Sequence, residues 1–255
     1  MRHFIILAAV SVMGSITGTA AFAGFTFGPV INELAPSGPR SSVAITVRNP
    51  TDQKVPVMLY IVHREPKPDG SEEYKETPEI DDLFQIYPSQ LILNANDLRT
   101  VRVSWIGQPK VTSELSFRLI AEELPFSMEP ESSDMRTRAK ILIATKYVGS
   151  VYITPPEAKP ELQIIAKMAD PEFKDQQGKI QLEITNTGTK HVIPRKLVLK
   201  IAGASGAPIE LRADEFKKLA GDNVLAGKMR RHFLTAPAQL PPGPYKVTFE
   251  LPEEK

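Results

Sequence analysis

The feature that most restricts the fold of this chain is a hydrophobic pattern with a period of two residues. Val43, Ile45 and Val47 alternate with other side chains, and the pattern returns in residues 98–105 and 115–120. Successive side chains of a β-strand point to opposite faces of a sheet, so this pattern is typical of strands with one buried face. The 23 prolines are scattered along the 255 residues and interrupt any long helix. We therefore predict an all-β protein.

Turn residues separate the predicted strands at short, regular intervals. Seven strands precede residue 155, with a turn at residues 49–52 and a polar hairpin or solvated loop over residues 67–82. Short strands at this spacing predict a sandwich of two antiparallel sheets with immunoglobulin-like architecture.

A proline-rich connector divides the chain. Residues 155–160 include three prolines, which favour an extended and rather stiff linker. Weaker strand signals follow it, with a hint of a helical turn at residues 213–219. We therefore expect two immunoglobulin-like β-sandwich domains, an N-terminal one over residues 24–155 and a smaller one over residues 156–255.

The first 23 residues have the pattern of a secretory signal peptide. The apolar run at residues 4–12 is too short to span a bilayer, and Ala21-Phe22-Ala23 supplies a small-x-small cleavage site. We expect residues 1–23 to be removed after Ala23 and the remaining chain to be exported.

The composition argues against several classes of function. The 31 basic and 30 acidic residues leave no basic excess for nucleic acid, and the absence of cysteine excludes disulfides and thiolate metal sites. His63, His191 and His232 lack metal-ligand spacing, and the adjacent glutamates of Glu72-Glu73 and Glu122-Glu123 would point to opposite faces of a strand. We predict no enzyme activity, cofactor, metal or small-molecule substrate, although a hydrolase or metalloenzyme on a β-sandwich stays a weaker alternative.

Residues 139–153 form the longest β-like stretch and are largely apolar on both faces. The last strand of an antiparallel sandwich normally buries one face and exposes the other. A loop or the second domain could cover the additional apolar face. Alternatively, the strand is an exposed hydrophobic edge kept for the strand of a partner. One face of this stretch carries Ala139, Ile141, Ile143, Thr145 and Tyr147.

Several short motifs, in their order along the chain, resemble those of periplasmic pilus-assembly chaperones of the chaperone-usher pathway. Two of them, residues 67–70 and 186–192, are more similar to the branch often called archaic. The remaining motifs are Phe27-Gly28-Pro29-Val30, Val47-Arg48-Asn49-Pro50, Gln85-Ile86-Tyr87-Pro88, Val101-Arg102-Val103, residues 117–125 from Phe117 to Pro125, and Val151-Tyr152-Ile153-Thr154-Pro155.

This resemblance implies a boomerang of two immunoglobulin-like domains in the periplasm. The last strand of the first domain would be lent to a pilus or fimbrial subunit that lacks a strand, and the chaperone would deliver that subunit to an outer-membrane usher. The inserting face carried over to this chain is the face with Ala139, Ile141, Ile143, Thr145 and Tyr147. Self-association of the free form, to shield this edge, is a further expectation.

The chain departs from the better-known branch of this family at the residues that bind the terminal carboxylate of the subunit. The arginine and lysine that do so fall near Glu33 and Ser150 here, and neither residue is a cation. Lys146, Arg99 and Arg102 are substitute anchors, and Lys146 is our preferred one.

Glu114 matches an acidic residue that helps to hold the two domains together in the family. Its usual arginine partner falls at Thr154, so the family ion pair cannot form here.

A different class of function is a structural or adhesive fibre subunit built of immunoglobulin-like domains. Such a subunit needs a donor extension with alternating apolar residues at its mature N-terminus, and residues 24–33 have this character only in part.

Overall fold

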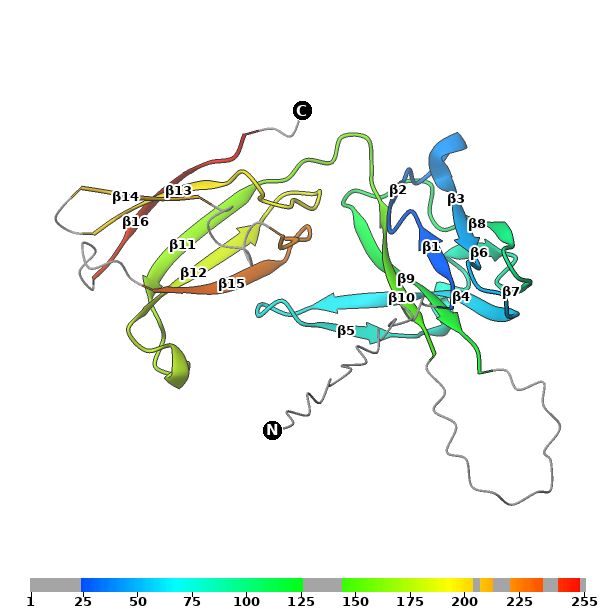
Figure 1. The fold of residues 1–255 in the computed structure, drawn as a ribbon. Helices are drawn as coiled ribbons and strands as arrows, with labels where there is room; N and C mark the ends of the chain where they lie inside the picture. The colour runs from blue at the N-terminus through cyan, green and yellow to red at the C-terminus, as the bar shows by residue number, and fades with distance from the viewer. Residues whose placement is uncertain (1–23, 126–143, 204–206, 213–220, 236–242, 253–255) are drawn as a thin grey trace, which may run out of the picture.

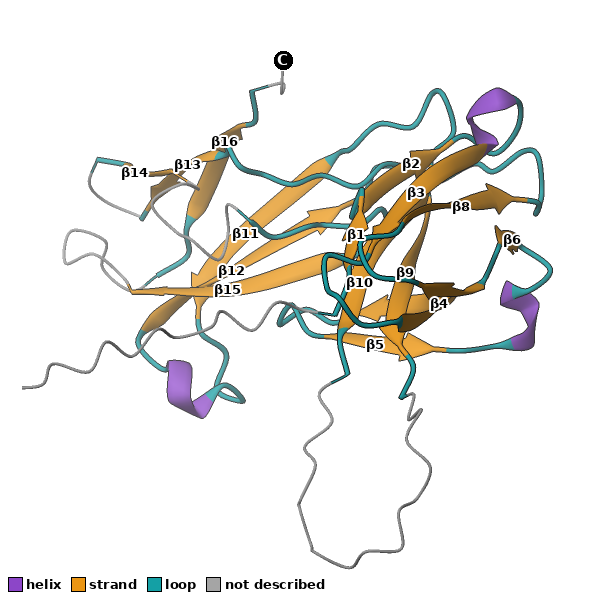
Figure 2. Ribbon diagram, turned by 45° about the vertical axis from the view of Figure 1, so that its right-hand side comes forward, coloured by secondary structure: helices purple, strands orange, loops and turns teal. Residues whose placement is uncertain are grey.

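The computed structural model describes residues 24–125, 144–203, 207–212, 221–235 and 243–252, which form two lobes built of strands (Figure 1). The first lobe contains strands β1 to β10 and the second lobe strands β11 to β16. The prediction of an all-β protein with two immunoglobulin-like β-sandwiches in a boomerang arrangement is confirmed. The regular helices among the described residues are single 3-10 turns, drawn in purple in Figure 2.

Two sheets face each other in the first lobe. One has the strand order β1-β3-β8-β6, and the other has the order β2-β10-β9-β4-β5, with β7 on the same edge of β4 as β5 but at the other end of that strand. The strands are β1 (Thr26–Gly28), β2 (Ile31–Leu34), β3 (Ser42–Arg48), β4 (Val55–Pro66), β5 (Glu72–Lys75), β6 (Phe84–Tyr87), β7 (Gln90–Leu93), β8 (Leu98–Trp105), β9 (Leu115–Glu123) and β10 (Lys146–Ile153).

The core of the first lobe comes from the alternating residues that the sequence indicated. Ile45, Val101 and Val103 of one sheet and Leu119 and Val151 of the other are fully buried in one cluster. Trp105, Phe84 and Phe117 add a group of aromatic rings with centroids 4.9 to 6.1 Å apart. Burial of this apolar surface is the main stabilising contribution to the lobe.

The second lobe is a smaller sandwich of two three-stranded sheets. The strand orders are β11-β12-β15 and β14-β13-β16, with a core that includes Ile180, Leu182 and Leu199. The strands are β11 (Leu162–Met168), β12 (Lys179–Asn186), β13 (Val198–Ala202), β14 (Ile209–Arg212), β15 (Met229–Thr235) and β16 (Lys246–Glu250). The helical turn expected at residues 213–219 lies outside the described residues, and the domain boundary at residues 155–160 stays a prediction.

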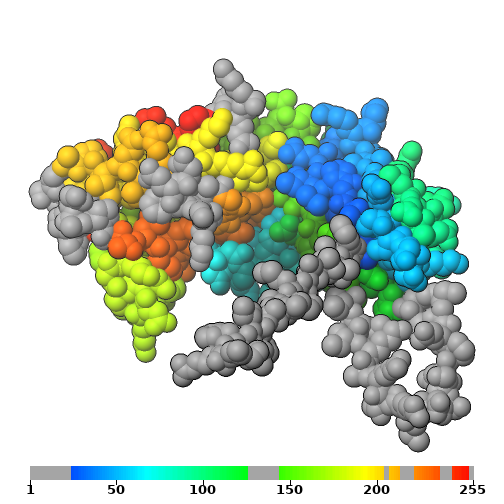
Figure 3. All heavy atoms as spheres, viewed as in Figure 1, coloured from blue at the N-terminus to red at the C-terminus, as the bar shows by residue number. Residues whose placement is uncertain are grey.

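The polar segment at residues 67–82 contains the turn and the second strand of a long hairpin, followed by a 3-10 turn at Pro78–Ile80. Strand β4 continues past the end of its pairing with β9, turns at Lys67–Gly70 and returns as β5, with Arg64 paired to Tyr74. In Figure 1 the hairpin extends from the first lobe to the second. The N–H of Arg231 donates a hydrogen bond of 2.7 Å to the carbonyl of Pro68, and Lys228 forms an ion pair with Glu65 at 3.2 Å. In the space-filling view, the cyan to teal atoms of the hairpin lie against orange atoms of the second lobe (Figure 3).

Candidate functional site

Strand β10 is paired along both of its edges only over its second half. Strand β9 follows one edge from Lys146 to Ile153, whereas β2 lies parallel to the other edge only from Ser150 onward. The N–H of Ser150 points toward β2 and donates to the carbonyl of Val30 at 2.7 Å. Backbone polar groups alternate in direction, so those of Lys146 and Val148 point to the same side. No described strand pairs with β10 there, and we call this stretch, Lys146–Gly149, the open edge.

One face of β10 belongs to the core of the first lobe. Val151 and Ile153 are fully buried, and Tyr147 packs edge-on against Phe25 with ring centroids 5.0 Å apart. The Tyr147 hydroxyl donates to the carbonyl of Phe25 at 2.8 Å. Thr145 precedes the strand, and its carbonyl accepts a hydrogen bond of 2.9 Å from the N–H of Glu123. The pairing with β9 thus begins before Lys146.

The opposite face of β10 is apolar near the open edge and polar toward the second lobe. Val148 is 40% exposed, and Ile31, which lies beside Ser150 on β2, is 53% exposed. Ser150 itself lies opposite Arg118 on β9. Exposed apolar side chains beside unpaired backbone form a surface on which another strand can be placed.

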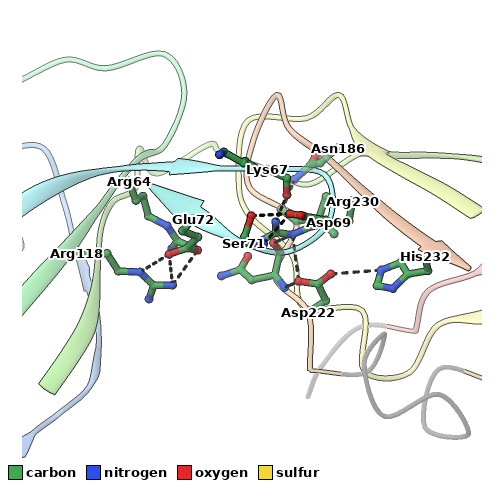
Figure 4. A network of polar contacts seen from close by, with 12 residues as sticks. Arg64, Lys67, Asp69, Ser71, Glu72, Arg118, Asn186, Asp222, Arg230 and His232 are labelled. Atoms are coloured by element: carbon green, nitrogen blue, oxygen red, sulfur yellow. Dashed lines mark hydrogen bonds and ion pairs between the residues drawn. The ribbon is translucent and has the colours of Figure 1, made fainter. Parts of the chain in front are cut away.

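A cavity of about 420 Å³ lies between the lobes beside this polar part. Three arginines and two carboxylates line it, together with Ser150, Tyr152 and Asn223. We call this cavity the arginine cleft and define it by its charged residues, which are Arg64, Glu72, Arg118, Asp222 and Arg230. Figure 4 shows their polar contacts.

Glu72 lies between two arginines in the arginine cleft (Figure 4). Arg118 donates to both carboxylate oxygens of Glu72, with Nε and Nη2 each 2.9 Å from an oxygen, and Arg64 forms an ion pair with the same carboxylate. Arg118 Nη1 also donates to Ser150 Oγ at 2.6 Å. Such bidentate contacts fix both the position and the orientation of a carboxylate.

Burial alone would raise the pKa of Glu72, but the Arg118 hydrogen bond and the positive charges of Arg64 and Arg118 outweigh burial and lower it below its ordinary value. Asp222 is in a similar situation. Burial raises its pKa, and the contacts with His232 and Arg230 lower it by more. Both carboxylates are therefore charged at neutral pH.

The second lobe closes the arginine cleft through direct contacts. Asn223 Nδ2 donates to the hydroxyl of Tyr152 at 2.7 Å, and Arg64 Nη1 donates to the same hydroxyl at 3.3 Å. Arg230 Nε lies 3.1 Å from Asp222 Oδ1, and Arg230 Nη1 donates to the carbonyl of Lys67 in the hairpin.

Glu114 connects the end of β10 to the second lobe. The Thr154 hydroxyl donates to Glu114 Oε2 at 2.8 Å, and the N–H of His191 donates to Oε1 at 3.0 Å. His191 Nδ1 lies 2.7 Å from the same oxygen, and the His191 ring stacks on Tyr152 at 4.0 Å. In the family that the sequence resembles, the partner of this acidic residue is an arginine at the position of Thr154. Here the Thr154 hydroxyl and His191 of the second lobe contact Glu114 instead.

The predicted anchors lie outside the arginine cleft. Lys146 Nζ is 3.1 Å from the Tyr60 hydroxyl and 3.4 Å from Glu122 Oε2. Arg99 and Arg102 lie on β8 in the other sheet of the first lobe, and Arg99 pairs with Asp97. Of the predicted inserting face, Thr145 and Tyr147 are described above. Ala139, Ile141 and Ile143 lie outside the described residues.

Sequence reasoning did not single out Arg64, Arg118 or the role of Glu72. Ser150 stands near a position at which the resembling family has a cation, and the register of β9 against β10, which comes from the structure, places Arg118 opposite Ser150. Neither a metal site nor a membrane segment is found in the described part of the chain. Its His, Asp and Glu side chains form no group able to share a metal ion, and none of its helices has the length and hydrophobicity to cross a bilayer.

No protein-family model and no curated protein sequence matches this chain. Solved structures do match its fold. One belongs to a chaperone–tip adhesin complex of CFA/I fimbriae biogenesis, with 15% identity, a TM-score of 0.58, and coverage of 90% of this chain and 95% of that chain. Another is the class 5 fimbriae chaperone CfaA, with 14% identity, a TM-score of 0.55, and coverage of 90% and 100%.

A third match comes from the archaic chaperone-usher Csu pili of Acinetobacter baumannii. It is a chain of the CsuC–CsuE chaperone–tip adhesion subunit pre-assembly complex, with 16% identity, a TM-score of 0.54, and coverage of 85% of this chain and 89% of that chain. At these identities the matches establish the fold. The two-lobed architecture of this protein is the architecture found in solved structures of fimbrial chaperone systems, as the sequence resemblance indicated.

Proposed function

We propose that this protein is a non-enzymatic periplasmic chaperone that binds pilus or fimbrial subunits by donor-strand complementation and delivers them to an outer-membrane usher. The open edge is the observation that carries the proposal. On the side of β10 that faces away from β9, the backbone of Lys146–Gly149 has no described strand partner, and it lies next to exposed Val148 and Ile31. The fold it shares with structures of fimbrial chaperone systems supports the same assignment.

The face pattern of β10 supports strand donation. Tyr147, Gly149 and Val151 face the core of the first lobe, and a strand extended toward the N-terminus would place Thr145, Ile143, Ile141 and Ala139 on the same face. In the complex we expect these side chains to continue the hydrophobic core into the subunit. Burial of each isoleucine contributes roughly 1.5 to 3 kcal/mol before the cost of ordering the strand.

The N-terminal strands of this protein argue against the alternative of a fibre subunit. Such a subunit would donate its N-terminal segment to a neighbour. Here Thr26–Gly28 pairs with β3 and Ile31–Leu34 pairs with β10, so this segment belongs to the protein's own two sheets.

Co-expression with small secreted β-proteins encoded beside this gene tests the proposal. We expect a one-to-one complex with a subunit that is otherwise degraded or aggregated. Ile141→Asp or Ile143→Asp should abolish the complex, whereas Ile165→Asp, at an exposed position on β11 of the second lobe, should leave it intact. Unchanged capture by both strand variants, or fibres formed by this chain alone, would contradict the proposal.

Lys146 stays the preferred anchor among the cations predicted from the sequence. It lies at the open edge and is already paired with Tyr60 and Glu122. Lys146→Ala should lower the yield of the complex if Lys146 binds the subunit. An unaltered yield would remove it as an anchor.

A further inference from the structure

The arginine cleft holds one of the protein's own carboxylates in a position suited to binding a partner's carboxylate. Glu72 accepts hydrogen bonds from Arg118 Nε and Nη2, and it is paired with Arg64, whose side chain is 1% exposed. A guanidinium fork and a second arginine around one carboxylate form a geometrically specific site for that group.

The cleft has polar groups that Glu72 does not satisfy. Arg64 Nε and Asn223 Oδ1 are both buried without a hydrogen-bond partner in the described part of the chain. The three arginines and two carboxylates that line the cavity leave one positive charge in excess. A buried, unpaired donor on an arginine is costly, so the cleft favours a further acceptor group.

The segment that carries Glu72 is weakly attached to the first lobe. Strand β5 contributes four residues, pairs only with β4, and exposes its remaining side chains, Glu73, Tyr74 and Lys75. Near the turn, the hairpin is held by the second lobe, through the carbonyls of Lys67 and Pro68 and the Glu65–Lys228 ion pair. Glu72 can therefore leave the arginines by a shift of a short edge strand without disturbing the core.

The cleft is also close to the open edge. Ser150, which accepts a hydrogen bond from Arg118, is one residue beyond Gly149 at the end of that edge. Strand β2 occupies this edge from Ser150 onward, and Arg118 and Arg64 lie on β9 and β4 beyond the other edge of β10. A chain added to the open edge would therefore have to leave that edge at Ser150 and cross the outer face of β10 to reach the arginines.

We propose that Glu72 is an internal placeholder that occupies a carboxylate site formed by Arg64 and Arg118 until a carboxylate of the bound partner displaces it. The inference rests on the proposed function for the identity of the partner, but the site itself is defined by this chain alone. The incoming group is a carboxylate, either a chain terminus or an aspartate or glutamate side chain. Glu72 makes binding selective, because a partner without a correctly placed carboxylate gains nothing from displacing it.

The first test removes the placeholder. Thermal unfolding of the full chain is measured with increasing propionate, up to about 0.1 M, at an ionic strength held constant with sodium chloride. Glu72→Gln should be stabilised by propionate, with a rise in the unfolding temperature of about 3 °C, whereas the wild type should not respond. Glu73→Gln is the matched control, because it removes the same charge from the exposed neighbouring residue and should behave as the wild type.

Two further variants keep the result interpretable. Glu72→Gln with Arg118→Gln should lose the response to propionate. If Glu72→Gln does not fold, Glu72→Asp replaces it, since the shorter side chain keeps the charge but cannot reach both arginines. Equal responses of the wild type and the Glu72 variant, or no response of a folded Glu72 variant, would overturn the proposal.

The second test uses a captured subunit and distinguishes the two sources of the carboxylate. Glu72→Gln should bind the subunit about tenfold more tightly than the wild type, because it no longer competes for the arginines. A subunit whose C-terminal carboxylate is amidated by peptide ligation should lose this gain if the terminus is the ligand, and should keep it if a side chain is. Capture that does not depend on Glu72 would overturn the placeholder and leave the chaperone function standing. A wild type that captures no subunit would overturn the function, and the propionate result would still decide on the site.

Discussion

At the scale of single residues, Gly149 shows how closely the strands of the first lobe approach one another. A Cβ atom at this position would lie 3.1 Å from the carbonyl oxygen of Val30 and 3.2 Å from the ring of Phe27. The carbonyl belongs to the backbone that pairs with Ser150, so it cannot move without disturbing β10.

Gly149→Ala should therefore destabilise the protein by about 1 to 3 kcal/mol, as expected for overpacking. Urea unfolding of the full chain measures this loss. Gly243→Ala is the matched control, because no atom lies within 4 Å of its added Cβ. Equal unfolding midpoints for the two variants would contradict the close approach.

Glu114 is the second residue whose role can be tested alone. It is 8% exposed and accepts hydrogen bonds from the Thr154 hydroxyl and the N–H of His191. Glu114→Ala leaves these donors unsatisfied and should cost about 1 to 3 kcal/mol in the free energy of unfolding. Glu114→Gln, which keeps one acceptor oxygen, should lose less, and an equal loss in both variants would assign the effect to charge.

At the scale of elements, the β4–β5 hairpin makes stability dependent on pH through Glu72. Its folded-state pKa is lowered from the ordinary value of 4.5, so the unfolded chain binds the proton more readily. The contribution of Glu72 to stability is complete above pH 4.5 and is lost as the pH falls through the folded-state pKa.

Glu72→Gln should flatten this acid-side loss. The measurement is the free energy of unfolding of the wild type and the variant between neutral pH and pH values well below the ordinary pKa of Glu72. Parallel curves for the two proteins would show that Glu72 does not titrate in this range.

The elements were more predictable than the site. The strand residues of the first lobe, such as Val43, Ile45 and Val47, followed from their alternation because one face of each strand is buried. Strands β6 and β7 are separated at Pro88 and Ser89, since a proline has no N–H to continue the ladder. The arginine cleft depended on information that local sequence lacks, namely the register of β9 against β10 and the reach of the hairpin.

At the scale of the whole molecule, the hairpin ties the two lobes together. Arg230 is 4% exposed and joins Asp222 and the carbonyl of Asn223 in its own lobe to the carbonyl of Lys67 in the other. Arg230→Ala removes the side chain that makes these contacts and should allow the lobes to move relative to each other.

Small-angle scattering should then show a larger radius of gyration and a broader distance distribution. Arg231→Ala is the matched control, because the Arg231 side chain contacts Glu183 and Phe173 of its own lobe. An unchanged scattering curve for Arg230→Ala would show that the remaining contacts are sufficient to hold the lobes.

The first described residue of the chain lies next to the start of β10. The N–H of Gly24 is 3.4 Å from Thr145 Oγ1, and the strands that follow Gly24 belong to both sheets of the first lobe. A purification tag fused directly ahead of Gly24 would thus emerge beside the open edge, where the proposed function places the bound subunit. Recombinant protein tagged there would give falsely weak pull-downs, whereas a tag after β16 would leave that edge unobstructed.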